Sequence, residues 1–381
     1  MKKEYLGLGS IGRLRGILDH FNAQKVFLVT GKTSFRASGA EDTVMPILTQ
    51  YRYCHYVPQS HFPQVSAIIE EIPSFKKFDP DVIVAIGGGH VLDTAKALNV
   101  LAFQGGDLNR YVSGEIPLKK KGVPLITIPT TAGTGSEYTQ FAIVYAGEKK
   151  YSLAHEEYIL PDACIVDPGL TRSMPVRVAA ETGLDALCQG IESYWSVASN
   201  EVSRGFAKEA IALAMRSLIQ AVHDPDDESR LDMAKAASLS GKAINITKTT
   251  AAHALSYPIS THFGIAHGHA VALTLQGFLP YNYHVSDQDC NDPRGPEFVR
   301  KSMEELIVLL GAADIDGASR KLRRLIEEIG LEGTFSKCGI AREDIPTIIH
   351  DGFSQARMAN NPRMLRRHDI QRVLNDLVLH P

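Results

Sequence analysis

Short apolar runs that are typical of buried strands alternate with amphipathic runs over the first 170 residues. The clearest run is DVIVAI (81–86), which is rich in β-branched residues, ends at three glycines and precedes the helical pattern LDTAKALNVLAF. Similar strand-like runs are KVFLVTG (25–31), YRYCHYVP (51–58) and VPLITIPTT (123–131). Strands that alternate with helices form a parallel sheet covered on both faces. The pattern therefore predicts an α/β domain over residues 1–170.

Helical periodicity replaces this alternation in the second half of the chain. From Pro175 onward apolar residues recur at helical spacing, for example in VRVAAETGLDALCQGIESYWS (176–196) and ASRKLRRLIEEIG (318–330). A chain of 381 residues also exceeds one ordinary hydrophobic core. We therefore expect a second, all-α domain over residues 171–381.

The composition argues against several classes of protein. A net charge of −3 gives no support for nucleic-acid binding. Five cysteines are scattered without a CxxC pair, which suits reduced thiols in the cytoplasm. The chain starts without the apolar segment of a signal peptide, and no apolar run approaches the roughly 20 residues that span a bilayer. We expect a soluble cytoplasmic protein that does not bind membranes.

The glycine triplet Gly87, Gly88 and Gly89 lies between the strongest strand and a helix. Glycines let the backbone approach a phosphate closely, and a helix N-terminus adds free N–H groups and a positive dipole end. The spacing is not that of the G-x-G-x-x-G fingerprint. The alternative interpretation is a plain strand-to-helix turn. Asp93 and Lys96 follow three residues apart, close to one face of the helix.

A second loop rich in Thr, Gly and Ser follows the strand at 123–131. It reads ITIPTTAGTGSEYT (126–139), and its Thr130, Thr131 and Thr134 offer hydroxyl groups to a diphosphate or a ribose. A flexible surface loop is the alternative. Two such loops after two strands place a ligand at the carboxyl ends of the sheet, where open α/β sheets bind ligands.

Two histidines and a carboxylate in the helical half have the chemistry of a metal site. His253 and His267 lie in AAHALSYPISTHFGIAHGHAVAL, and Asp185 shares a helix face with Gln189, four residues later. Imidazole nitrogens and a carboxylate suit Zn²⁺ or Fe²⁺, and three protein ligands leave the open position that a catalytic metal needs. Gln189 can add a carbonyl oxygen. For any single histidine, an ordinary hydrogen-bonded role is the alternative.

The ordered motifs AIGGGHVLDTAKAL, IPTTAGTGSE, TGLDALCQGIES, AAHALSYPI and HGHAVALTL resemble those of the iron-containing (group III) alcohol dehydrogenases, over nearly the whole chain. The resemblance implies a Rossmann-like dinucleotide-binding domain followed by an all-helical metal-binding and catalytic domain, an architecture shared with dehydroquinate synthase. It implies a dehydrogenase that transfers hydride between NAD or NADP and a small alcohol or aldehyde, with Fe²⁺ or Zn²⁺ bound. It also implies a homodimer.

The resemblance extends to individual residues. Gly87, Gly88, Gly89 and Asp93 match the phosphate loop and its acidic neighbour, and Thr130, Thr131 and Thr134 match the second nucleotide-contacting segment. Asp185, His253 and His267 match three of the family's four metal ligands, and Gln189 stands where the fourth is usually histidine. Tyr257 stands where many members have another histidine, so it is predicted to relay a proton or contact the substrate, with a core aromatic as the alternative.

Several choices stay open from the sequence. Gly31 ends the first strand where many NAD-preferring members have Asp, and Lys32 follows it, so both NAD and NADP fit. The chain also resembles a branch of phosphonoacetaldehyde reductases, for which Lys242, Lys248, Arg357 and Arg363 are candidate anion-binding residues, with surface charge as the alternative. The rival functions are a non-redox synthase resembling dehydroquinate synthase and a nucleotide-binding protein whose metal site has decayed.

Overall fold

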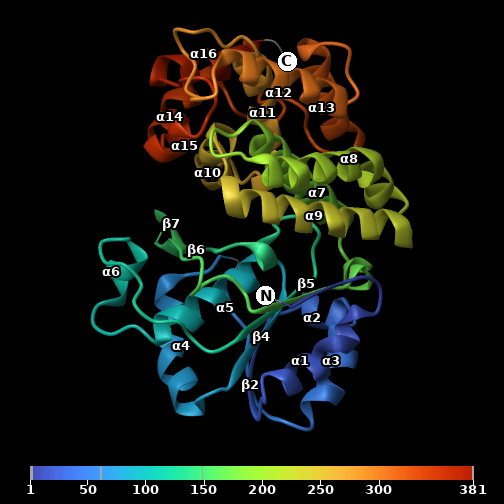
Figure 1. Cartoon of the computed structure of the whole chain (residues 1–381), viewed down its shortest axis with the longest axis vertical. Coiled ribbons are helices and arrows are strands. Elements are labelled where there is room, and N and C mark those ends of the chain that lie inside the picture. The colour runs from blue at the N-terminus through green and yellow to red at the C-terminus, as the bar shows by residue number, and fades with distance from the viewer. Residues whose placement is uncertain (1–2, 61, 148, 380–381) are drawn as a thin grey trace. The chain divides into compact units, whose positions relative to one another are not determined.

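The computed structural model describes residues 3–60, 62–147 and 149–379 and divides the chain into two compact units (Figure 1). The first unit ends at Met174 and the second begins at Pro175. The boundary expected from the sequence lay at residue 170. Each unit is described separately below.

The first unit is built on a six-stranded, all-parallel sheet with the order β1-β8-β5-β4-β2-β3. This sheet confirms the predicted α/β fold. The strands that form it are β1 (Lys3–Leu6), β2 (Lys25–Thr30), β3 (Arg52–Tyr56), β4 (Val82–Gly87), β5 (Leu125–Pro129) and β8 (Ala163–Val166).

Alternating side chains of the central strands enter two separate cores. In β2, Phe27 and Val29 pack in one core, whereas Val26 and Leu28 pack in the other. The first core is completed by α4 (Val65–Phe78) and α5 (Gly89–Ala102), and the second by α1 (Leu14–His20) and α3 (Ala40–Leu48). Helices on both faces therefore bury the sheet, as parallel sheets require. The short helices of this unit are η1 (Ser10–Arg13), α2 (Ser34–Ala37), α6 (Leu108–Val112), η2 (Ser136–Tyr138) and η3 (Pro168–Thr171).

An antiparallel hairpin in this unit was not predicted. It consists of β6 (Phe141–Ala146) and β7 (Lys149–Ala154), and β6 packs against α5. The β7 sequence KKYSLA carries two lysines and leaves most of its residues partly or fully exposed, so it lacks the apolar run of a buried strand. Its place beside the second predicted loop matters for the site described below.

The second unit is built from helices, which confirms the predicted all-α character. Two of them begin with capping boxes, at Asn200–Ser203 and at Asp226–Ser229. The helix α7 packs against α8, α9 and α11, and α10 packs against α11. The main helices are α7 (Val176–Trp195), α8 (Glu201–His223), α9 (Asp227–Thr247), α10 (Ala251–Phe263), α11 (His267–Tyr283), α12 (Pro296–Leu309), α13 (Ile315–Glu328), α14 (Ile345–Gly352), α15 (Gln355–Ala359) and α16 (Arg367–Leu379), with a 3₁₀ turn η4 (Arg342–Asp344).

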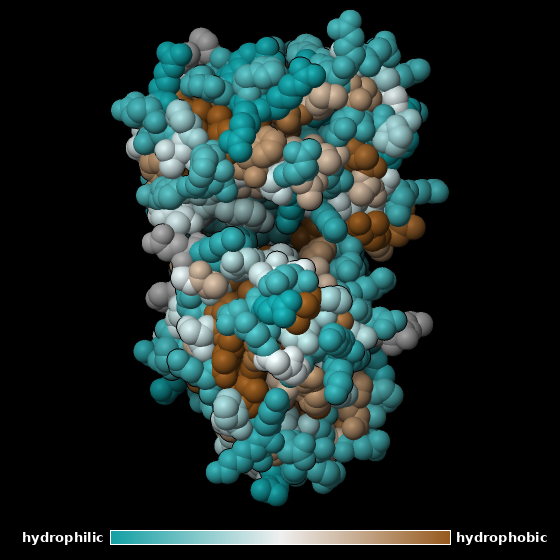
Figure 2. Space-filling view, turned by 90° about the vertical axis from the view of Figure 1, so that its left-hand side faces the viewer, coloured by the Kyte–Doolittle hydropathy of each residue, from teal (hydrophilic) through white to brown (hydrophobic). Residues whose placement is uncertain are grey.

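Polar side chains cover much of the face shown in Figure 2, and apolar side chains show through only in patches. Among the described residues, the most exposed large apolar side chains include Val308 at 75% and Val202 at 59%. None of the described helices combines the length and the apolar character needed to cross a membrane.

Candidate functional site

The carboxyl ends of three adjacent strands bring the predicted nucleotide-binding residues together. The Gly31 N–H donates to the Ile86 carbonyl (3.2 Å), and the Thr130 N–H donates to the Gly87 carbonyl (3.0 Å). Gly31 therefore lies beside the end of β4, and Thr130 lies on its other side. This is the edge of a parallel sheet at which ligands bind.

The glycine triplet is packed against the threonine-rich loop. A Cβ atom added to Gly89 would lie 2.9 Å from Thr134 Cγ2, and one added to Gly88 would lie 3.6 Å from Thr131 Cγ2. Gly89 is also the first residue of α5, so its N–H belongs to the group of amides left unpaired at a helix N-terminus. The absence of side chains at these glycines therefore lets the two loops lie together around a positive helix end.

Asp93 and Lys96 hold the second loop through contacts within the chain. The Asp93 carboxylate accepts hydrogen bonds from Ser136 Oγ (2.7 Å) and from the Ile143 N–H (3.0 Å). Lys96 is fully buried and donates to the carbonyls of Ser136 (2.5 Å) and Phe141 (2.8 Å). Burial lowers the pKa of Lys96 to about 8 against the opposing effect of Asp93. Both side chains therefore tie the loop to α5, and direct contact of Asp93 with a nucleotide stays a prediction.

One buried hydroxyl at this edge fits a polar ligand. Thr130 is 4% exposed, and its Oγ1 makes no hydrogen bond to the part of the chain that the structure describes. A buried hydroxyl without a partner costs free energy unless a bound group satisfies it. The residues present therefore fit the phosphate or ribose of a dinucleotide.

Replacing Gly89 by alanine is expected to raise the KM for the nicotinamide cofactor about tenfold or more. The new Cβ would meet Thr134 at 2.9 Å, so the loop must shift, and overpacking of this kind costs about 1–3 kcal/mol. Steady-state kinetics with NADH and NADPH measure the effect. Gly105→Ala is the matched control, because a Cβ there has nothing within 4 Å. An unchanged KM in Gly89→Ala would contradict the placement of the cofactor at this loop.

Three side chains of the helical unit direct their ligand atoms at one point. Asp185 on α7, His253 on α10 and His267 on α11 each offer one ligand atom, and these atoms lie within 4.8 Å of one another. Asp185 Oδ1 is 3.4 Å from His253 Nε2 and 3.8 Å from His267 Nε2. Asp185 Oδ1 and His253 Nε2 are buried and have no hydrogen-bond partner among the described residues. A divalent cation satisfies such atoms, so the donor set fits Zn²⁺ or Fe²⁺.

Glu192 sets the tautomer of His253. The Glu192 carboxylate is fully buried, and one of its oxygens contacts His253 Nδ1. Its other oxygen accepts hydrogen bonds from Thr250 Oγ1 (2.6 Å) and the Ala252 N–H (2.9 Å). Because a carboxylate accepts the Nδ1–H, the lone pair of His253 in its neutral form lies on Nε2, which faces Asp185.

Ser256 and Gly268 place His267. Ser256 Oγ donates to the His253 carbonyl (2.8 Å) and lies 3.0 Å from His267 Nδ1, so it accepts the Nδ1–H and leaves the lone pair on Nε2. A Cβ atom at Gly268 would lie 2.1 Å from the Glu181 carbonyl and 2.8 Å from Asp185 Cβ. Glycine is therefore required where the start of α11 crosses α7.

The charges of this group are strongly coupled. Burial alone would lower the pKa of His253, but Glu192 and Asp185 raise it to about 9. Burial opposes ionisation of both carboxyl groups, and the histidines, together with hydrogen bonds to neighbouring groups, hold the pKa of Asp185 and of Glu192 below its ordinary value. Below a pH of about 9, the pKa of His253, a metal ion that binds here displaces a proton from this imidazole.

Gln189 and Tyr257 lie beside the three ligand candidates. Gln189 Nε2 donates to Asp185 Oδ2 (3.0 Å), and its Oε1 accepts from Ser240 Oγ (3.0 Å). The ring of Tyr257 is half-buried and stacks on His267 with centroids 5.3 Å apart and planes 10° from parallel. All five residues predicted for this site, including Asp185 and His253, are therefore brought together.

Sequence reasoning missed the residues that support the ligands, which include Glu192, Ser256, Gly268 and Ser240. Glu192 is seven residues after Asp185 on α7, and this spacing shares a helix face. That periodicity was the one available signal. Its contact with His253 spans 61 residues and depends on helix packing.

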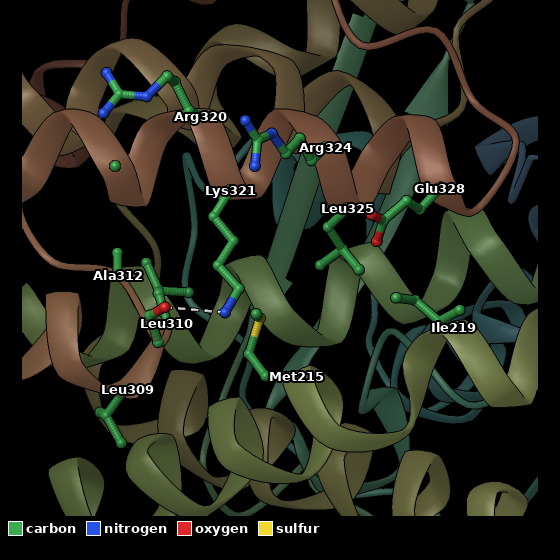
Figure 3. Close-up of a pocket in the computed structure, with 12 residues that line it drawn as sticks. Met215, Ile219, Leu309, Leu310, Ala312, Arg320, Lys321, Arg324, Leu325 and Glu328 are labelled. Carbon is green, nitrogen blue, oxygen red and sulfur yellow. Dashed lines mark hydrogen bonds between the residues drawn. The ribbon is translucent and has the colours of Figure 1, made fainter.

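Two further features lie outside this site. The ligand atoms of His269, Glu332 and Cys338 also come within 4.8 Å of one another, and His269 Nε2 is bonded to the Glu332 carbonyl (2.7 Å), which ties α11 to that loop. A surface pocket of about 610 Å³ lies between α8 and α13. Figure 3 shows the side chain of Lys321 pointing from α13 into this pocket, and its Nζ donates to the Gly311 carbonyl (3.0 Å). None of the predicted site residues lines this pocket.

A parallel-sheet unit with two phosphate-type loops and a helical unit with an Asp/His/His group are the features of a metal-dependent, dinucleotide-binding enzyme. Comparison with known families agrees with this class. The chain belongs to the iron-containing alcohol dehydrogenase family: residues 2–168 match the model for iron-containing alcohol dehydrogenase, and residues 179–378 match the C-terminal model of the same family. The predicted family and the predicted enzyme class are confirmed.

Three similar proteins are 26–36% identical to this chain. Long-chain-alcohol dehydrogenase 1 of Geobacillus thermodenitrificans is 32% identical and covers 97% of this chain, aligned over 93% of its own length. Phosphonoacetaldehyde reductase of Streptomyces viridochromogenes is 36% identical over 78% of this chain and 76% of its own. The crystal structure of sulfoacetaldehyde reductase from Bifidobacterium kashiwanohense in complex with NAD⁺ superposes with a TM-score of 0.88 at 26% identity, covering 100% of this chain and 98% of that one.

Proposed function

We propose that this protein is a metal-dependent, NAD(P)-linked reductase of a small aldehyde, acting in reverse as an alcohol dehydrogenase. The observation that carries the proposal is the convergence of Asp185 Oδ1, His253 Nε2 and His267 Nε2, two of which are buried without a partner among the described residues. Three protein ligands leave a position for substrate. The family membership supports the redox chemistry.

The bound groups supply the electronic chemistry: a divalent metal polarises the carbonyl as a Lewis acid, and nicotinamide supplies or accepts the hydride. The residues of this chain bind and orient. Asp185, His253 and His267 hold the metal, and the loops around Gly88 and Thr130 hold the dinucleotide. Tyr257, half-buried and stacked on His267, lies next to the ligand group and is proposed to contact the substrate or pass its proton.

An anionic aldehyde, with phosphonoacetaldehyde as the candidate, is the proposed substrate. Arg357 on α15 is half-buried, and its guanidinium makes no hydrogen bond or ion pair with any residue that the structure describes. The helix α15 packs against α10, which carries His253. Asn360, three residues after Arg357, donates to the carbonyls of Thr247 (2.8 Å) and Thr249 (3.2 Å), which flank Lys248. The segments that carry Lys248 and Arg357 are therefore joined by hydrogen bonds next to α10.

The other two candidate cations have different surroundings. Arg363 donates to Asp289 Oδ2 (2.8 Å) and to the Tyr281 carbonyl (2.7 Å), so its guanidinium is used within the fold. Lys242 Nζ lies over the Phe206 ring, 5.9 Å from its centroid. Lys248 has a backbone φ of 58°, which is strained for a residue with a side chain. Residues with such strained backbones cluster at functional sites. Lys248 and Arg357 are therefore the better anion-binding candidates.

Replacing Arg357 by alanine is expected to lower kcat/KM for phosphonoacetaldehyde about tenfold or more and to leave kcat/KM for propanal unchanged. A charge-assisted hydrogen bond to a phosphonate contributes about 1.5–3 kcal/mol. Steady-state reduction of both aldehydes measures this. Arg300→Ala, at an exposed position of α12, is the matched control. Equal kcat/KM for the two aldehydes in the unmodified protein would contradict an anion pocket.

Two rival functions are separated by simple measurements. A non-redox synthase on the same scaffold returns its nicotinamide unchanged, so net consumption of NAD(P)H during turnover excludes it. A nucleotide-binding protein with a decayed metal site retains no stoichiometric metal, which metal analysis of the purified protein tests. The converging ligand atoms and the family membership favour the dehydrogenase over both.

The proposal extends to a homodimer that acts in the cytoplasm. The family resemblance supports the dimer, and the five free cysteines suit a reducing compartment. Light scattering is expected to give twice the chain mass of 41.7 kDa. A monomeric mass would overturn the dimer without affecting the proposed chemistry.

A further inference from the structure

Gln189 joins Asp185 to a neighbouring helix through a buried hydrogen-bond relay. It lies one turn after Asp185 on α7 and is 4% exposed. Its Nε2 donates to Asp185 Oδ2 (3.0 Å), and its Oε1 accepts from Ser240 Oγ (3.0 Å) on α9. Both ends of the amide are therefore used within the protein.

This relay makes the two oxygens of Asp185 unequal. Oδ2 is held by the amide of Gln189, whereas Oδ1 is buried without a hydrogen-bond partner among the described residues. Oδ1 is also the oxygen that lies 3.4 Å from His253 Nε2 and 3.8 Å from His267 Nε2. The amide thus turns one oxygen of the carboxylate toward both histidines.

The opposite orientation of the amide is the less favourable one. It would let the amide donate to Ser240 while the Ser240 hydroxyl donates to the Ala237 carbonyl, 3.0 Å away. It would also set the carbonyl oxygen of Gln189 against Oδ2 of Asp185, a carboxylate that is 3% exposed. Two acceptors facing each other in a buried site leave a charged oxygen without a donor. The free-energy cost of that unsatisfied charge exceeds the stabilisation from the hydrogen bond to Ser240.

We infer that Gln189 is a positioning residue and not a metal ligand. Its N–H orients Asp185 so that Oδ1 alone coordinates, and Ser240 fixes the amide from behind. The protein then supplies three ligands, Asp185, His253 and His267. Gln189, at the position that the resemblance matches to a fourth ligand, orients Asp185 instead. The inference rests on the proposed metal-dependent function.

Gln189→Leu tests the inference, because leucine keeps the approximate volume and removes both hydrogen bonds. Chelator competition is expected to show Zn²⁺ affinity about 10–100-fold weaker, the usual effect of losing an outer partner of a ligand. The d–d absorption of the Co²⁺-loaded variant is expected to keep the band positions and intensities of the unmodified protein, because the same three side chains coordinate. A changed Co²⁺ spectrum, which reports a lost ligand, or an unchanged Zn²⁺ affinity would overturn the inference.

Two further variants separate positioning from general loss of structure. Ser240→Ala removes the distant end of the relay. It is expected to weaken Zn²⁺ binding several-fold and to leave the Co²⁺ spectrum unchanged. This variant decides the question if Gln189→Leu does not fold, because full Zn²⁺ affinity in Ser240→Ala would overturn the relay. Gln276→Leu is the matched control, a buried glutamine on α11 that binds the Gly333 carbonyl (3.1 Å). It is expected to lower the melting temperature and to leave Zn²⁺ affinity unchanged. If the unmodified protein binds neither Zn²⁺ nor Co²⁺, the proposed function fails first.

Discussion

Replacing His267 by alanine is expected to lower kcat/KM for aldehyde reduction by about three orders of magnitude and to leave the fold intact. The side chain of His267 is 36% exposed, so its removal leaves little empty volume. It supplies one of the three ligand atoms, and Lewis-acid stabilisation contributes several kcal/mol to a transition state, where about 1.4 kcal/mol corresponds to tenfold in rate. Steady-state kinetics, metal content and circular dichroism check the three parts of this prediction.

The chain offers a matched control for that variant. His284 directly follows α11 and is exposed, so His284→Ala removes an imidazole near the far end of the same helix. It is expected to keep full activity and full metal content. Unchanged turnover in metal-stripped His267→Ala would show that the Asp185, His253 and His267 group takes no part in the reaction.

Glu192→Gln is expected to weaken Zn²⁺ binding about 10–100-fold, because it removes the charge that holds the Nδ1–H of His253.

Glu192→Ala also leaves the Thr250 hydroxyl and the Ala252 N–H without their acceptor. Breaking a buried charge pair in this way costs about 3–5 kcal/mol, so urea unfolding is expected to show a strong loss of stability. Glu305→Gln, a carboxylate of the same unit that is 39% exposed, is the control for metal affinity.

The contact between His253 and Glu192 predicts how the stability of the metal-free protein depends on pH. The folded pKa of His253, about 9, lies above its ordinary value of 6.5, so its contribution is complete below pH 6.5 and is lost as the pH rises through about 9. The folded pKa of Glu192 is lowered, so its contribution is present above its ordinary value of 4.5 and is lost as the pH falls through the folded value. The melting temperature of the apo protein is expected to fall above pH 6.5. Glu192→Gln is expected to flatten that fall, and an equal slope in both proteins would contradict the coupling.

Much of the first unit was predictable because strand and helix signals are local. The runs at 25–31, 81–86 and 123–131 form β2, β4 and β5. The glycines and threonines that were predicted to bind a ligand lie at the carboxyl ends of these strands. The hairpin β6–β7 was missed, since its second strand is polar and partly exposed. The anchoring of its first strand by Lys96 and Asp93 depends on contacts across 45 and 50 residues.

The kinds of ligand at the metal site follow from residue types and their order along the chain, because Asp, His and His are recognisable wherever they stand. Their arrangement does not follow, because helical periodicity shows which face of a helix is buried but not which helix covers it. The contacts between Glu192 and His253 span 61 residues, and those between Gln189 and Ser240 span 51. The packing of α7 against α9 and α11, and the contact of Glu192 with α10, therefore set the tautomers of the histidines, the coordinating oxygen of Asp185 and the role of Gln189.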